Sequence, residues 1–213
     1  MKVALVEDQL MFRSMLRRLI VTDCKGRVAL EAGTLAELRA KIAVFSAVDL
    51  LLLDIRLPDG DGLDFLEDLT NRQFAVPVLL LSSSCEDYIV NRVNRSFAQG
   101  FVHKDEEPKV LLTAIQTVVA GGTFFSPRFT ARKRALANQD ESFEKKLSPR
   151  EQEIMGYMGT GFTDAEIAAS LGITASTATT HRRNIMEKLG LHSARDVQTY
   201  ALKTGFTTPD RLQ

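Results

Sequence analysis

The stretch Leu50-Leu-Leu-Leu-Asp54-Ile-Arg-Leu-Pro-Asp-Gly60 joins an unbroken apolar run to an aspartate and then to a turn sequence. Continuous rather than alternating apolar residues are typical of a strand that is buried on both faces of a parallel sheet. A carboxylate at the end of such a strand must find partners or take part in chemistry. The residues that follow the other apolar runs indicate which role Asp54 has.

Short apolar runs recur along residues 1–121, and segments with helical periodicity separate them. The runs are Val3–Val6, Val28–Leu30, Val48–Ile55, Val76–Leu81 and Phe101–Val102. Thr34-Leu-Ala-Glu37 has the sequence of a capping box, Pro108 suits the first turn of another helix, and Gly121-Gly122 suits its end. Five strands alternating with helices predict a parallel, doubly wound, flavodoxin-like α/β domain.

From Leu147 the pattern is entirely helical, and residues that can cap a helix mark each start. The starts are Ser148-Pro-Arg-Glu151, Thr163-Asp-Ala-Glu166, Thr174 and Ser193-Ala-Arg-Asp196. Gly172 separates the second helix from the third, as in a helix-turn-helix. Residues 147–213 therefore predict a small all-α domain of four helices, and the polar, basic residues 122–146 predict a linker.

Composition narrows the class of protein. The formal net charge is zero, so no global basic field indicates a nucleic-acid partner. Cys24 and Cys85 lack metal-ligand spacing and are expected to be reduced thiols. No apolar run approaches the roughly 18 residues that a membrane helix needs, and the N-terminus does not read as a signal peptide. We therefore expect a cytoplasmic protein without a membrane partner.

Polar residues follow four of the five predicted strands. They are Glu7 and Asp8 after the first, Asp54 after the third, Ser82 after the fourth and Lys104 after the fifth. Ligands of open parallel sheets bind beyond the carboxyl ends of the strands, so these side chains predict one site. Three close carboxylates repel unless a cation joins them, and oxygen ligands with room for water suit Mg²⁺.

The same set gives Asp54 a chemical role. A carboxylate can attack phosphorus and form an acyl phosphate when a metal and a cation neutralise the developing charge. Alone, Asp54 could equally well cap the turn that follows it. With Glu7, Asp8, Ser82 and Lys104 at neighbouring strand ends, the phosphoacceptor role is favoured.

Several segments resemble the bacterial response-regulator receiver domain over residues 1–121. They are Glu7-Asp8, Asp54 with Pro58 four residues later, Pro77-Val-Leu-Leu-Leu-Ser82 and Gly100-Phe-Val-His-Lys104-Asp. The resemblance implies that Asp54 is the phosphoacceptor. It implies that Mg²⁺ is bound by Asp8, by Asp54, by the backbone carbonyl of Arg56 and, through water, by Glu7. It also implies that Ser82 and Lys104 bind the phosphoryl group and that Phe101 is the aromatic switch residue.

The C-terminal part resembles the LuxR-type DNA-binding domain. The matching segments are Leu147-Ser-Pro-Arg-Glu151, Gly161-Phe-Thr-Asp-Ala-Glu-Ile-Ala168, Leu171-Gly-Ile-Thr174 and Thr180-His-Arg-Arg-Asn-Ile-Met-Glu-Lys-Leu-Gly190. By family geometry, Thr179, Thr180 and Arg183 face base edges, and Ser176, Thr177, His181, Arg182 and Lys188 lie nearer the phosphates. Together the two parts resemble a NarL/FixJ-type response regulator.

Some positions depart from the family pattern. Glu7 and Ser82 are common variants that should leave Mg²⁺ and phosphoryl binding intact. Arg56, two residues past the acceptor, flanks any attacking water, and we expect it to change the lifetime of the phosphoryl group. Thr179 and Ala178 stand where the family often carries Lys and Val. The lost cation reduces counterion release and predicts a shallower salt dependence of DNA binding.

We expect a DNA-binding response regulator that a cognate histidine kinase phosphorylates and that binds operator DNA as a homodimer. A phosphatase with an aspartyl intermediate is a rival, but Arg56 occupies the place of its second carboxylate, so we expect no enzyme. A second rival is a DNA-binding or scaffold protein that needs no phosphorylation. We also expect Met11, Phe12, Met15 and Leu16 to form a core stripe.

Overall fold

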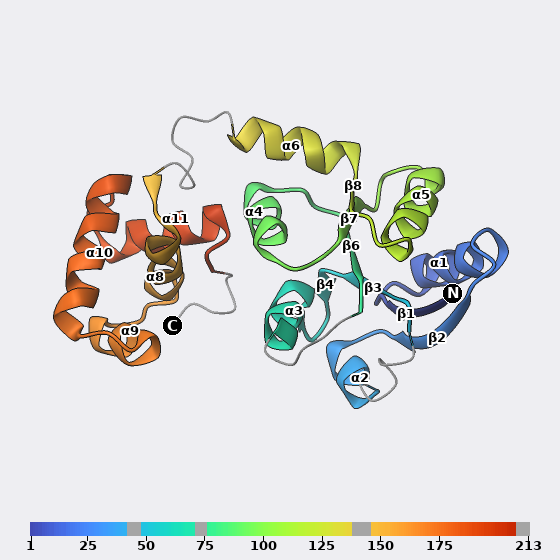
Figure 1. Cartoon of the computed structure of the whole chain (residues 1–213), viewed down its shortest axis with the longest axis horizontal. Coiled ribbons are helices and arrows are strands. Elements are labelled where there is room, and N and C mark those ends of the chain that lie inside the picture. Colours follow the sequence, from blue (N-terminus) through green and yellow to red (C-terminus); the bar gives the residue numbers. More distant parts are fainter. Residues whose placement is uncertain (42–47, 71–75, 138–145, 208–213) are drawn as a thin grey trace. The chain divides into compact units, whose positions relative to one another are not determined.

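The computed structural model describes residues 1–41, 48–70, 76–137 and 146–207. Two compact units divide the chain: residues 1–85 with 93–131, and residues 86–92 with 132–213. The first unit is α/β and the second is helical (Figure 1). Among the described residues, no helix has the length and apolarity that crossing a membrane requires.

A six-stranded parallel sheet forms the centre of the first unit. Its strands, in spatial order, are β2 (Arg27–Ala32), β1 (Lys2–Val6), β3 (Leu50–Asp54), β6 (Val78–Ser82), β7 (Gly100–His103) and β8 (Phe124–Phe125). Neighbouring strands pair in parallel throughout. The chain runs outward from β1 to β2 and then continues on the other side of β1, so the strand order reverses between β1 and β3. The parallel, doubly wound architecture is confirmed.

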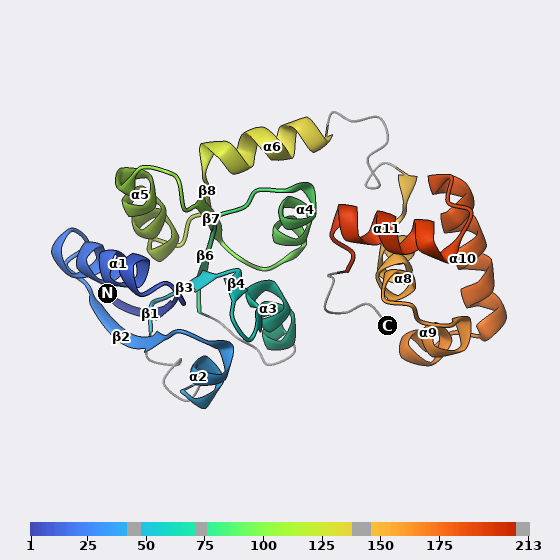
Figure 2. The same cartoon turned by 180° about the vertical axis from the view of Figure 1, so that it is seen from behind.

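Helices lie on both faces of this sheet. They are α1 (Leu10–Thr22), α2 (Leu35–Ala40), α3 (Gly62–Thr70) and α5 (Pro108–Val119), while α4 (Asp87–Arg95) falls across the division between the units. Figure 1 shows α1 and α5 on one face and α2 and α3 on the other, and Figure 2 shows the same arrangement from behind. The inner strands β1, β3, β6 and β7 are buried from both sides, as their unbroken apolar runs predict.

The α1 stripe is only partly core. Leu16 is fully buried, and Phe12 packs against the core, but Met11 is 86% exposed and Met15 is 39% exposed. The expectation that Met11 and Met15 are core residues is therefore wrong. Residues 11 and 15 form one row on the helix and residues 12 and 16 form the next, about 100° away. The helix turns only the second row toward the sheet.

The segment predicted as a linker begins with ordered structure. The sixth strand, β8, adds to the edge of the sheet beside β7, so the predicted count of five strands is one too few. It is followed by α6 (Pro127–Ala137), from which Phe129 is completely buried. Residues 138–145 lie outside the described residues. The boundaries at residues 121 and 147 remain predictions.

The second unit contains the predicted helices at the C-terminal end. They are α8 (Pro149–Gly159), α9 (Asp164–Leu171), α10 (Ala175–Leu189) and α11 (Ala194–Thr204). Each N-cap hydroxyl accepts a hydrogen bond from the backbone amide three residues later, and the capping boxes at Ser148 and Thr163 are complete. Gly172 ends α9 in a left-handed conformation, with φ of 63°. That conformation favours glycine and gives the tight turn into α10.

The box at Thr34 forms only in part. Thr34 accepts from the Glu37 amide, but the Glu37 carboxylate accepts from the amide of Gly33 rather than from that of Thr34. The residue types predict the cap correctly, whereas the backbone ahead of α2 decides which amide the glutamate can reach.

Candidate functional site

The predicted site residues come together at the carboxyl ends of four adjacent strands. Glu7 and Asp8 follow β1, Asp54 ends β3, Ser82 ends β6, and Lys104 follows β7. Because these strands lie side by side and run in parallel, the five side chains share one edge of the sheet. The edge includes the point between β1 and β3 where the strand order reverses, which is where ligands bind in folds of this type.

The Lys104 ammonium joins two carboxylates at this edge. Lys104 Nζ donates to Asp54 Oδ2 at 2.7 Å and lies 2.8 Å from Glu7 Oε2. All three side chains are buried. The ammonium also lies 4.9 Å from the centre of the Phe12 ring, a cation–π distance. One buried cation therefore serves two buried acids.

Burial dominates the electrostatics of this group. Desolvation raises the pKa of Asp54 above its usual value, although its bonds to Lys104 and to the Arg56 amide act in the opposite direction. Burial likewise raises the pKa of Glu7, and the neighbouring Asp54 adds to the increase. For Lys104, burial disfavours the ammonium, but the bond to Asp54 and the ion pair with Glu7 outweigh it and raise its pKa. The acids are therefore incompletely neutralised, and an additional cation would stabilise both.

The carboxylates fit a magnesium ion. One oxygen from each of Glu7, Asp8 and Asp54 lies within 4.8 Å of the other two. Glu7 Oε2 is buried and has no aligned hydrogen-bond donor among the described residues, because the nearby ammonium approaches it in poor geometry. Asp8 is exposed, so one side of the cluster is open to water. An all-oxygen set with an open side is what Mg²⁺ requires.

Ser82 and Phe101 lie on the two strands that continue this edge. Ser82 is buried, and its Oγ accepts from the Ser84 amide at 3.1 Å, which leaves the hydroxyl proton available to a ligand. Phe101 is completely buried, and its ring centre lies 4.7 Å from that of Phe129 in α6. The ring of Phe125 stacks on Phe129 at 5.2 Å. The predicted switch residue thus contacts the helix that follows the sheet.

Two residues at the site were not predicted as part of it. Phe12 was expected in the core, yet its ring lies beside the Lys104 ammonium. Arg13 Nη1 donates to the backbone carbonyl of Glu7 at 2.7 Å and so helps to hold the β1–α1 loop. Their place directly after Glu7 and Asp8 was the available signal, since the first turn of a helix that follows a strand lies over the strand end.

The predicted DNA-contact residues lie on α10, mostly on its exposed surface. Thr180 Oγ1 donates to the Ser176 carbonyl, and the hydroxyls of Ser176 and Thr177 bond to Thr174 at the helix start. His181 is half-buried and Arg183 is exposed. No described residue pairs with the Arg183 guanidinium. Arg183 is therefore an exposed cation of α10 without a partner in the part of the chain that the structure describes.

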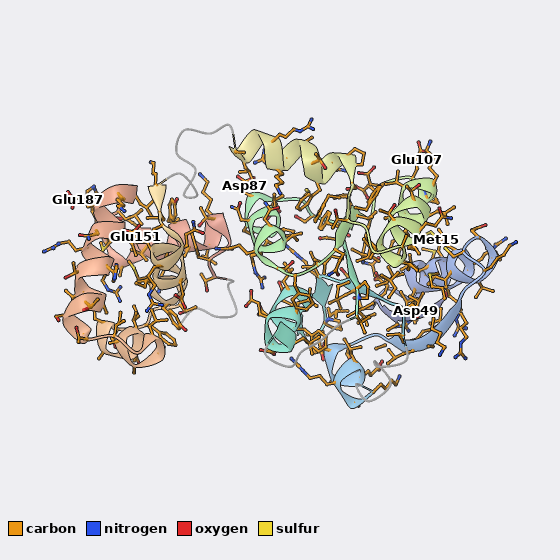
Figure 3. All side chains as sticks on the ribbon, in the orientation of Figure 1. Met15, Asp49, Asp87, Glu107, Glu151 and Glu187 are labelled. Carbon is orange, nitrogen blue, oxygen red and sulfur yellow. The ribbon has the colours of Figure 1, made fainter. Side chains whose placement is uncertain are left out.

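Two other predicted phosphate contacts have partners within the domain. Arg182 Nε donates to Asp164 at 2.5 Å, and its Nη2 donates to the Phe162 carbonyl at 2.6 Å. Lys188 Nζ donates to both carboxylate oxygens of Glu151, at 2.7 and 2.8 Å. Glu151 lies on α8 (Figure 3), and the bond from Lys188, together with those from Ser148, lowers the pKa of its carboxyl to about 2. Arg182 and Lys188 therefore fix α10 to the helices beside it.

Comparison with known proteins identifies both parts of the chain. Residues 3–116 match the response regulator receiver domain, and residues 145–201 match the bacterial regulatory proteins of the luxR family. The transcriptional regulatory protein MctR of Rhizobium johnstonii is 32% identical over 209 residues, which cover 97% of this chain and 95% of MctR. The transcriptional regulatory protein UhpA of Escherichia coli is 32% identical over 189 residues, which cover 89% of this chain and 91% of UhpA.

A solved structure supports the fold. RcsB of Salmonella enterica serovar Typhimurium, bound to a promoter, superposes with a TM-score of 0.64 at 20% sequence identity, covering 97% of this chain and 99% of RcsB. On the sequence matches along nearly its whole length, the chain belongs to the NarL/FixJ-type response regulators, which combine a receiver domain with a LuxR-type DNA-binding domain.

Proposed function

We propose that a histidine kinase transfers a phosphoryl group to Asp54 and that this modification controls DNA binding by α10. The observation that carries the proposal is the Lys104 ammonium between Asp54 and Glu7, beside Asp8 and Ser82. The arrangement supplies a nucleophilic carboxylate, a fixed cation and a hydroxyl donor at one strand edge. A turn-capping role for Asp54 would require none of these neighbours.

In the transfer step, an Asp54 oxygen attacks the phosphorus of a phosphohistidine. The new P–O bond forms an acyl phosphate while the P–N bond breaks, and its electron pair leaves with the imidazole, which takes up a proton. Lys104 then pairs with a phosphoryl oxygen, and the Ser82 hydroxyl donates to another. Asp8, Asp54, the Arg56 carbonyl and, through water, Glu7 would hold Mg²⁺, which neutralises phosphoryl charge.

In the DNA-binding step, α10 lies in the major groove with its N-terminal end toward the bases. Thr179, Thr180 and Arg183 face base edges, and Ser176, Thr177 and His181 lie nearer the phosphates. Arg183 can form two hydrogen bonds to guanine, worth roughly 1–3 kcal/mol of discrimination. Arg182 and Lys188 are not included among the proposed DNA contacts, because their side chains already bind the carboxylates of Asp164 and Glu151. Two subunits would read half-sites about one helical turn apart.

Intact mass after incubation with Mg²⁺ and acetyl phosphate tests the acceptor. We expect wild type to gain the mass of one phosphoryl group and Asp54→Asn to gain none. Asp59→Asn is the matched control, because Asp59 is a nearby carboxylate that caps the amides of Leu35 and Ala36 instead. A phosphoryl group on Asp54→Asn would show that another residue is the acceptor.

DNA binding by the same samples tests the control step. We expect phosphorylated wild type to bind a duplex more tightly than the unphosphorylated chain, and Asp54→Ala to show no response to acetyl phosphate. Equal binding by wild type and Asp54→Ala under both conditions would instead support a DNA-binding protein that needs no phosphorylation.

A further inference from the structure

Asp164 holds two residues of the recognition helix at once. It is the first residue of α9, and its carboxylate accepts from Thr179 Oγ1 at 2.6 Å and from Arg182 Nε at 2.5 Å. The Arg182 guanidinium is further tied to the Phe162 carbonyl at 2.6 Å. Asp164 and Arg182 are each 27% exposed. The carboxylate therefore lies at the surface, directly beside a residue expected to face DNA.

The cap of α9 does not depend on Asp164. Thr163 and Glu166 complete the capping box at this helix start, with the Glu166 carboxylate accepting from both the amide and the hydroxyl of Thr163. Asp164 contributes only a general preference for an acid in the first turn. Its substitution should therefore leave α9 folded, and its two bonds act on α10.

The two neighbouring arginines of α10 differ in availability. Arg183 is exposed and has no partner among the described residues, whereas Arg182 uses two of its nitrogens inside the domain. Phosphate contacts dominate the salt-dependent part of DNA affinity, and each cation that reaches a phosphate contributes to it. A carboxylate that binds Arg182 removes one such cation and adds a negative charge at the same surface.

We propose that Asp164 is an affinity-determining residue that weakens DNA binding by holding the Arg182 guanidinium away from the phosphates and by placing its own charge beside Thr179. The inference rests on the proposed position of α10 in the major groove. The inference predicts that the chain binds random-sequence DNA weakly. It also predicts that recognition of specific DNA sites depends on Thr179, Thr180 and Arg183.

The salt dependence of binding by Asp164→Asn tests this inference. An asparagine removes the charge, and its neutral amide oxygen accepts a weaker hydrogen bond from the Arg182 guanidinium than the carboxylate does. The probe is a labelled random-sequence duplex, titrated with the full chain at several salt concentrations, with and without acetyl phosphate and Mg²⁺. We expect a steeper plot of log affinity against log salt, by about 0.9 for each released arginine that reaches a phosphate. Affinity would then fall about 3.5-fold more between roughly 50 and 200 mM salt for each subunit.

Three further variants separate the possible causes of a steeper salt dependence. Arg182→Gln should keep the wild-type salt slope, because the clamped arginine makes no phosphate contact. The double variant Asp164→Asn/Arg182→Gln should lose the extra slope of the single variant. Glu153→Gln removes an equal charge from the exposed pair with Arg150 on α8, and should leave the slope unchanged.

The other possible results of these measurements each reject one part of the inference. An unchanged slope in Asp164→Asn would reject the inference. An equal increase of the salt slope in Asp164→Asn and in the double variant would show that the steeper slope comes from the lost negative charge and not from Arg182. If neither wild type nor Asp164→Asn binds the duplex in either state, the proposed DNA-binding function itself would be rejected.

Discussion

Replacing Phe129 with alanine should destabilise the α/β unit strongly, although Phe129 lies in the segment that the sequence predicts as a linker. Its side chain is completely buried, and its ring contacts Phe101 at 4.7 Å and Phe125 at 5.2 Å. At about 25 cal/mol per Å², removing roughly 150 Å² of buried ring surface costs about 4 kcal/mol. The range of about 3–5 kcal/mol for such substitutions in protein cores agrees with this value.

This cost is measured as the change in the free energy of unfolding of the full chain in urea. Hydrogen exchange of peptides from the sheet reports the unfolding of the α/β unit. The control is Arg128→Ala in the same helix, whose ion pair with Asp105 is exposed and should be worth about 0–1 kcal/mol. A loss below about 1 kcal/mol for Phe129→Ala would refute the reasoning, because it would mean that α6 does not belong to the folded core. Equal losses for both variants would show that the ring contacts of Phe129 contribute no more than the exposed ion pair of Arg128.

Three further predictions concern the ion pairs and the acceptor. Lys104→Met should lower the midpoint of thermal unfolding, because it leaves the buried carboxylates of Glu7 and Asp54 without a cation, at a cost of about 3–5 kcal/mol. In the same melting assay, Mg²⁺ should stabilise the variant more than it stabilises wild type. The Glu151 pKa is lowered from 4.5 to about 2, so the stability from its pair with Lys188 should be complete above pH 4.5 and lost as the pH falls toward 2. Acid unfolding should show a loss of about 1–3 kcal/mol for wild type over this range, reduced in Lys188→Met, and equal acid sensitivity would contradict the assignment. Arg56→Asn should shorten the phosphoryl lifetime severalfold if the long arginine shields the acyl phosphate, and an unchanged rate of dephosphorylation would exclude that role.

The sheet and its site could be predicted because two simple rules act together. Unbroken apolar runs identify strands buried on both faces, and the residue after each run must then lie at the same edge of the sheet. Asp54 and Lys104 are 50 residues apart in sequence, yet these rules alone place them together, and the structure brings them to 2.7 Å. Long-range contacts of this kind are predictable when the topology is regular.

The predictions from the sequence that were wrong have a different physical origin. Met11 and Phe12 are adjacent and equally apolar, and only the rotation of α1 against the sheet decides that one is exposed and the other packed. The two-residue strand β8 is too short to give an alternating or continuous pattern. The sequence also gives no sign of the ion pairs of Arg182 with Asp164 and of Lys188 with Glu151, because these partners lie on other helices, and the DNA contacts of both cations stay predictions. Charge alone cannot indicate which partner a cation has.

The contact between Phe101 and Phe129 also indicates how phosphorylation can act beyond its site. Lys104 follows β7, the strand that carries Phe101, so under the proposed phosphoryl transfer a new position of the Lys104 ammonium would act at the end of that strand. Protein interiors are close-packed, and the Phe101 ring cannot move without either a shift of Phe129 or a void beside it. Since Phe129 is carried by α6, this helix is the first element after the sheet that would respond to such a shift. The residues that the sequence presents as a linker are therefore placed to transmit the change.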